Sequence, residues 1–102
     1  MKEVIVIEWT DLALQDLDSI YSFISKDSVK NADLFIEELI LNVEEISLFP
    51  QRGRIIPQIK KDFYREIFVG TYRIMYKIED KTIFIMGIIH MSMDFNLGKF
   101  QK

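Results

Sequence analysis

The stretch that decides the fold is FYREIFV-GT-YRIMYKI-EDK-TIFIMGIIH, residues 63 to 90. It holds three runs rich in β-branched and aromatic residues, a composition typical of β-strands. We expect strands over Phe63–Val69, Tyr72–Ile78 and Thr82–His90. The turns between them are two and three residues long, and turns this short join antiparallel neighbours. The stretch therefore predicts a three-stranded meander. Its last run is the most apolar, as a strand in the interior of the whole sheet should be.

One further strand and two helices are expected before this meander. Glu3–Trp9 alternates its apolar side chains between two faces and predicts a strand. Thr10 is a suitable N-cap for a helix, and apolar residues at helical spacing follow it: Ala13, Leu17, Ile20, Tyr21 and Ile24. Asp27 or Ser28 caps a second helix, which Pro50 stops. Its apolar stripe comprises Ala32, Phe35, Ile36, Leu39, Val43 and Ile46.

The predicted architecture is a single α+β domain over residues 1–102. It has an N-terminal strand, a helical hairpin and the antiparallel meander, with the helices packed on one sheet face. We expect the other sheet face to be available for a ligand or partner. The segment Gln51–Asp62 contains Gly53, Pro57 and four basic residues and is expected to be an exposed connection. Met91–Lys102 is expected to be a tail or a short terminal helix.

Composition excludes several classes of site. The chain has no cysteine and one histidine, so we expect no disulfide, no thiolate nucleophile, no metal site and no cofactor. Its glycines are scattered singly and form no phosphate-binding loop. The longest strongly apolar run, residues 83–89, is too short to span a bilayer. The N-terminus does not resemble a secretory signal. We therefore expect a cytoplasmic protein without a membrane partner.

Charge is divided unevenly along the chain. Residues 1–50 carry 11 acidic and 3 basic side chains, a net of −8, whereas residues 51–102 carry 5 acidic and 10 basic ones, a net of +5. One interpretation is that surface charges segregated without consequence. The other is that the second half presents a basic face to an anionic partner while the first half stays solvated.

Basic and aromatic residues around the sheet are the candidates for chemistry. Arg65 and Arg73 lie in neighbouring predicted strands, and we expect them to share a face, where guanidinium groups bind phosphate or stabilise developing charge. The alternative is that each pairs with Glu66 or with a helix carboxylate. His90 ends the most apolar strand, as a structural residue or as a catalyst. The remaining basic candidates are Arg52, Arg54, Lys60 and Lys61.

Several segments taken together resemble the ParE/RelE superfamily of toxins. The opening strand and first helix are similar to theirs at Val6–Thr10, Ala13, Asp16-Leu17 and Ile20-Tyr21. Further similarity lies at Phe49–Arg54, at Arg65-Glu66, at Gly70–Tyr76 and at Ile89–Asp94. The last of these segments, a histidine followed by Met93-Asp94, resembles the ParE branch. The matches cover nearly the whole chain in order.

This resemblance implies the toxin of a type II toxin–antitoxin system, which a cognate antitoxin wraps and neutralises in a hetero-oligomer. ParE-type toxins poison DNA gyrase and have no assigned nuclease chemistry. Under this favoured hypothesis, no catalytic residue is expected. The target-binding candidates are then Arg52, Arg54, Lys60, Lys61, Arg65, Arg73, His90, Met93 and Asp94.

Two alternatives remain at this point. RelE-type toxins cut mRNA on the ribosome, and in that case Arg65, Glu66, Arg73 and His90 would carry the chemistry. Nuclease members tend to have an arginine where this chain has Ser92 and Met93, and its C-terminal segment lacks a tyrosine, which weakens this alternative. The second alternative is a degenerate member that binds its antitoxin and is no longer toxic.

Overall fold

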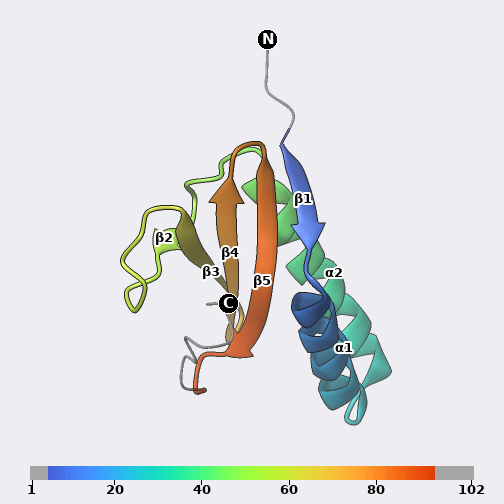
Figure 1. Ribbon diagram of the computed structural model, residues 1–102. Helices are drawn as coiled ribbons and strands as arrows, with labels where there is room; N and C mark the ends of the chain where they lie inside the picture. Colours follow the sequence, from blue (N-terminus) through green and yellow to red (C-terminus); the bar gives the residue numbers. More distant parts are fainter. Residues whose placement is uncertain (1–4, 94–102) are drawn as a thin grey trace.

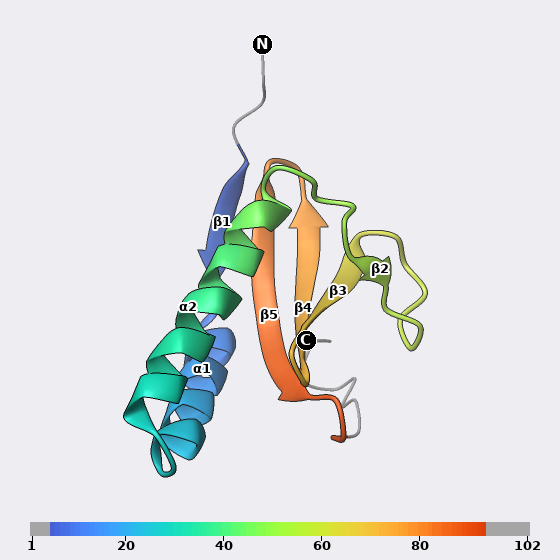
Figure 2. The same cartoon turned by 180° about the vertical axis from the view of Figure 1, so that it is seen from behind.

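The computed structural model describes residues 5–93, which form two helices and a five-stranded sheet (Figure 1). The strands lie side by side in the order β1-β5-β4-β3-β2. In chain order the elements are β1 (Val6–Trp9), α1 (Asp11–Ser25), α2 (Val29–Ile46), β2 (Arg54–Ile55), β3 (Tyr64–Val69), β4 (Tyr72–Glu79) and β5 (Thr82–His90). Both helices cover one side of the sheet (Figure 2). The predicted α+β class is confirmed.

The meander forms as predicted, and β1 completes the sheet from its other side. β3, β4 and β5 pair antiparallel in sequence. β1 pairs parallel with β5, from Val6 opposite Thr82 to Trp9 opposite Ile85. As a result β5 lies between β1 and β4, which explains why it is the most apolar strand.

Side-chain hydroxyl groups cap the N-termini of both helices. The Thr10 side chain accepts a hydrogen bond from the Ala13 amide at 3.2 Å and donates one to the Ile85 carbonyl at 2.8 Å, so it joins α1 to β5. Ser28 caps α2 by accepting from the Asn31 amide. α2 ends at Ile46, four residues before the proline that was expected to stop it.

The main core lies between the helices and the sheet face that they cover, called here the helix face. The apolar stripes predicted for both helices point into it, as do alternate residues of the strands. Its buried members are Ala13, Ile20, Leu39, Val43, Ile46, Ile67, Val69, Ile74, Tyr76, Ile83, Ile85 and Ile88. Within residues 5–93 neither helix is long and apolar enough to cross a membrane.

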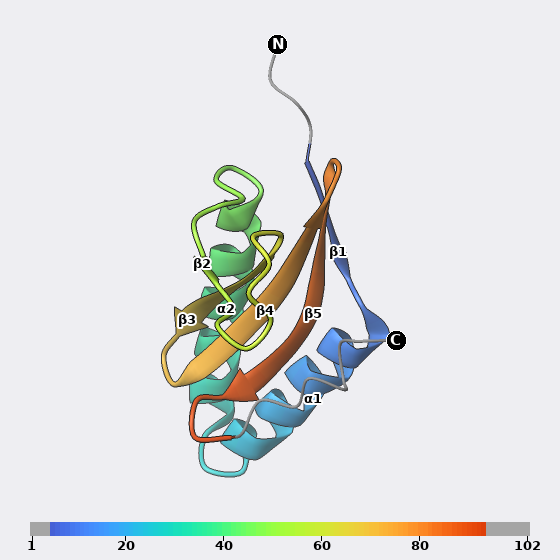
Figure 3. The same ribbon diagram turned by 60° about the vertical axis from the view of Figure 1, so that its left-hand side comes forward.

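The connection after α2 differs from the sequence prediction. Arg54–Ile55 forms the edge strand β2, which pairs antiparallel with β3. The following loop folds across the sheet face that the helices leave uncovered, the outer face (Figure 3). Ile56 and Met75 are each 1% exposed there, and they are packed by Ile59, Tyr64, Met86 and Ile89. The connection is largely exposed, as predicted, but Gly53 and Ile56 are buried in it. The second sheet face is available only in part, because the apolar residues of the loop cover some of it.

The predicted C-terminal tail is described only in part. Met91 to Met93 follow β5 in a turn, with the Met93 amide donating to the His90 carbonyl at 2.9 Å. Residues 94–102 lie outside the described residues, so the choice between a tail and a terminal helix stays open.

Candidate functional site

The register of β3 and β4 separates the two arginines that were expected to act together. Arg65 lies opposite Tyr76, and Arg73 lies opposite Phe68. Cross-strand partners point to the same sheet face, whereas successive residues alternate. Arg65 therefore shares the helix face with Tyr76, and Arg73 points to the outer face. The prediction of a common face is wrong.

A guanidinium–carboxylate cluster of Arg54, Glu66 and Arg73 occupies the outer face. One Glu66 oxygen accepts from Arg73 Nε at 2.9 Å and Nη2 at 2.6 Å, and the other accepts from Arg54 Nε at 2.7 Å. The Glu66 side chain has no exposed surface and that of Arg73 is 9% exposed, whereas that of Arg54 is 58% exposed. Two guanidinium groups thus satisfy one buried carboxylate and leave the cluster with a net charge of +1.

Arg65 holds the connection that follows α2. Its Nε donates to the Asp62 carbonyl at 2.8 Å and its Nη1 to the Gly53 carbonyl at 2.9 Å. The Gly53 amide in turn donates to the Tyr76 hydroxyl at 2.9 Å, and that hydroxyl donates to the Pro50 carbonyl at 2.7 Å. Burial raises the pKa of Tyr76 above its ordinary value. Arg65 is therefore engaged with backbone carbonyl groups and not with a carboxylate.

Gly53 and Tyr76 hold this region together through a close contact that was not predicted from the sequence. A Cβ atom on Gly53 would lie 2.6 Å from the Glu66 carbonyl oxygen and 2.7 Å from the Tyr76 hydroxyl. The connection can approach the sheet so closely only with glycine at this position. A lone glycine in an irregular segment gives too weak a signal to predict such an approach.

His90 lies away from the guanidinium–carboxylate cluster. It is the cross-strand partner of Tyr72, and the two rings meet edge to face with 5.2 Å between their centres. The Tyr72 ring also contacts Phe35 of α2, with 5.4 Å between ring centres. His90 Nδ1 lies 2.7 Å from the Ser92 hydroxyl and accepts the Ser92 amide at 3.1 Å. His90 is therefore on the helix face with Arg65. The four residues considered for RNA cleavage are divided between two sides of the sheet.

The other basic candidates are more accessible. Arg52 donates to Glu45 at 2.6 Å and to Asn42 at 3.2 Å, both on α2. Lys60 is exposed and has a positive φ of 60°. Lys61 lies 5.9 Å from the centre of the Phe63 ring. Met93 is 61% exposed, and Asp94 lies outside the described residues. Within residues 5–93 no three carboxylates or imidazoles gather where they would hold a metal.

Sequence comparison identifies the family. The model of the ParE toxin of the type II toxin–antitoxin system parDE matches residues 7–95, which is most of the chain. The chain belongs to the ParE toxin family. It is thus a toxin of the ParE/RelE superfamily, and the predicted preference for the ParE branch is confirmed. No curated protein sequence is significantly similar to it.

Solved structures show that the ParE-family chain has the fold of this superfamily. The chromosomal ParDE system of P. aeruginosa superposes with a TM-score of 0.71 at 19% identity, over 85% of this chain and 96% of that one. The RelBE2 toxin–antitoxin complex of Mycobacterium tuberculosis gives 0.62 at 20% identity, over 86% and 99%. A mutant of the E. coli toxin RelE in the free state gives 0.60 at 14% identity, over 84% and 82%.

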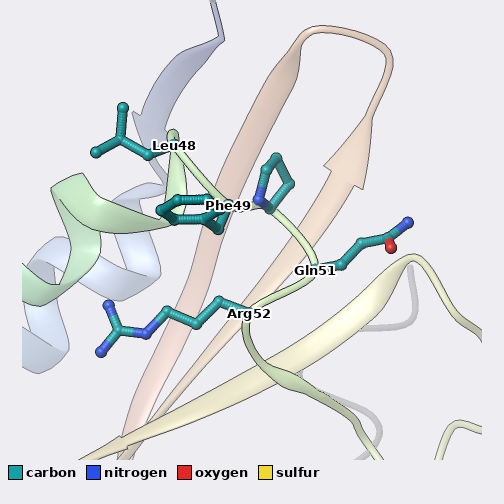
Figure 4. A pocket seen from close by; sticks show the side chains of 5 residues that line it. Leu48, Phe49, Gln51 and Arg52 are labelled. Atoms are coloured by element: carbon teal, nitrogen blue, oxygen red, sulfur yellow. The ribbon is translucent and has the colours of Figure 1, made fainter.

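A hollow lies at the end of α2 in this ParE-family toxin. Leu48, Phe49, Pro50, Gln51 and Arg52 line it (Figure 4). Leu48 and Phe49 are 71% and 68% exposed. Figure 4 shows the Arg52 side chain extending back along α2, where it meets Glu45.

Proposed function

We propose that this ParE-family toxin inhibits DNA gyrase by binding it, without catalysing a reaction of its own. The observation that carries the proposal is the buried pairing of Glu66 with Arg73. RNA cleavage without a metal needs a proton-transfer group and a charge stabiliser at the same phosphate. Here the Glu66 carboxylate and the Arg73 guanidinium neutralise each other on the outer face. His90 and Arg65 lie on the helix face.

The proposed gyrase contacts are the accessible residues of the outer face and its connection. In the complex of gyrase with DNA, the toxin is proposed to use Arg54, Lys60 and Lys61 there. It also uses Arg52, beside α2, and the segment from His90 to Asp94. Arg65 and Arg73 are better explained as residues that hold the connection and the cluster in place. Their substitution is expected to act through the fold.

We also propose that a cognate antitoxin binds this toxin. The P. aeruginosa and M. tuberculosis structures that share its fold are toxin–antitoxin systems. Apolar side chains suited to a protein partner are exposed along α2 and just after it, with Leu34 at 55%, Leu41 at 54% and Leu48 at 71%. A spacing of seven residues places Leu34 and Leu41 on one side of α2, and Leu48 follows just after its end. Exposed glutamates flank them at positions 37, 38 and 45, so basic residues are expected in the antitoxin segment that binds there.

The test is induction of the toxin alone in bacterial cells, followed by analysis of plasmid topology and of mRNA ends. We expect growth arrest, loss of negative supercoiling and trapped double-strand breaks, with mRNA intact. Codon-phased mRNA cuts in cells with normal plasmid topology would refute gyrase inhibition and support ribosome-dependent cleavage. Uninterrupted growth would indicate a degenerate toxin. Co-expression of a candidate cognate antitoxin is the control for neutralisation.

A further inference from the structure

Arg54 is held in one orientation by two independent contacts. Its Nε donates to the fully buried Glu66 carboxylate at 2.7 Å. Its guanidinium carbon also lies over the Phe68 ring, 5.2 Å from the ring centre. The hydrogen bond and the aromatic ring together fix both the position and the plane of the guanidinium group.

The terminal edge of this guanidinium is available for a ligand. Among residues 5–93, Arg54 donates only through Nε, and its side chain is 58% exposed. Nη1 and Nη2 therefore retain the paired N–H donors that recognise two oxygens of one phosphate. Arg73 also pairs with Glu66, so two guanidinium groups face one carboxylate and the cluster keeps a net positive charge beside this edge.

Charges on the rest of the molecule favour a polyanion at this face. The two helices carry eight acidic side chains and one basic one, and they cover the opposite side of the sheet (Figure 2). Residues 54–90, which build the sheet from β2 to β5, carry seven basic and four acidic side chains, a net of +3 that includes Arg65 on the helix face. The resulting field draws an anion toward the outer face and away from the helices.

We propose that Arg54 binds a phosphate of the DNA backbone through Nη1 and Nη2, with the Phe68 ring, 45% exposed, beside the adjoining sugar. The choice of DNA over RNA rests on the proposed function, because gyrase acts on DNA. Phosphate contacts of this kind position a protein on the duplex without reading its sequence. The toxin thus contacts the DNA that gyrase holds, in addition to the enzyme.

The test measures binding of a short fluorescent DNA duplex to the purified toxin by anisotropy, across a range of salt concentrations and without gyrase. We expect Arg54→Ala to weaken binding about tenfold and to reduce the slope of log K against log salt by about 1. Arg54→Lys keeps the charge and hence most of the slope, but it weakens binding because an ammonium group lacks the fork. Lys30→Ala, on the acidic helix side, should change neither quantity.

Phe68→Leu gives a second test that leaves Arg54 in place. It removes the aromatic ring beneath the guanidinium and should produce a smaller loss of affinity than Arg54→Ala, with the salt slope retained. Thermal unfolding of each variant verifies the fold.

Three results would overturn the inference: no binding of the wild-type toxin to DNA, unchanged affinity and slope for Arg54→Ala, or tighter binding to RNA of the same sequence. Because gyrase is absent, failure here is distinct from failure of the proposed function. A toxin that inhibits gyrase without binding DNA refutes only this inference. One that binds DNA through Arg54 without inhibiting gyrase refutes only the proposed function.

Discussion

Arg73 on β4 donates two hydrogen bonds to a single carboxylate oxygen of Glu66 on β3, at 2.9 Å and 2.6 Å. The pair lies on the outer face, and β2 supplies Arg54 to the second oxygen. Charges taken out of water are costly, and an unmatched one costs more than a paired one. The cluster therefore fixes the edge of the sheet and engages the Arg73 guanidinium with Glu66.

Replacing Glu66 by alanine should destabilise the fold strongly. The change leaves the guanidinium of Arg73 buried without its carboxylate, which typically costs about 3–5 kcal/mol. Urea denaturation measures this loss. Glu79→Ala is the matched control, because Glu79 pairs with Lys77 at 3.1 Å and is 55% exposed, and an exposed pair contributes less than about 1 kcal/mol. Equal losses for the two variants would show that the cluster is not a stability centre.

Replacing Tyr76 by phenylalanine should also destabilise the fold, by a smaller amount. It leaves the buried Gly53 amide without its acceptor and the Pro50 carbonyl without its donor. An unsatisfied buried group costs about 1–3 kcal/mol. The free energy of unfolding in urea is the measurement, and a wild-type value for the variant would refute the role assigned to this hydroxyl.

The raised pKa of Tyr76 predicts a dependence of stability on alkaline pH. Burial disfavours the phenolate in the folded state, so the unfolded chain loses this proton first. The contribution is fully present below the ordinary pKa of 10.0 and is lost as pH rises through the folded pKa. Unfolding should therefore become easier above pH 10.0 in the wild type than in Tyr76→Phe, since other groups titrate in both. Parallel curves for the two proteins would contradict this prediction.

Asp16 on α1 is expected to protect one backbone amide of β5. β1 pairs with β5 only as far as Ile85, and beyond that point the Ile88 amide donates to the Asp16 carboxylate at 3.0 Å. Asp16→Ala should speed amide hydrogen exchange at Ile88, whereas Asp16→Asn should keep most of the protection through its remaining oxygen. The control is Asp18→Ala on the exposed side of α1. Unchanged exchange at Ile88 in Asp16→Ala would rule out this capping role.

Local patterns predicted the elements of this fold well. The helical stripes, the Thr10 cap and the strand Thr82–His90 follow from periodicity and from turns, and these signals act over a few residues. Pairings between distant segments were not available from such patterns. The parallel contact of β1 with β5 and the loop that packs Ile56 against Met75 depend on residues far apart in the chain.

The faces of Arg65 and Arg73 were predictable, and the prediction failed for an identifiable reason. A two-residue turn at Gly70-Thr71 makes Val69 and Tyr72 partners, and the same register then places Arg73 opposite Phe68. Counting from the turn would have separated the arginines. The pairing of Arg73 with Glu66 was one of the two alternatives that the sequence left open, and it is confirmed. The additional pairing of Glu66 with Arg54 was harder to foresee, because β2 is too short to give a strand signal.

Inhibition of purified gyrase is the most direct test of the central claim, which is that this toxin acts by binding and not by cleaving RNA. The measurement is ATP-dependent supercoiling of relaxed plasmid with increasing amounts of toxin. We predict loss of supercoiling together with accumulation of a trapped gyrase–DNA cleavage complex, and no cleavage of mRNA by the same preparation in a translating extract. Full supercoiling activity at every toxin concentration, with phased mRNA cleavage in the extract, would contradict the account.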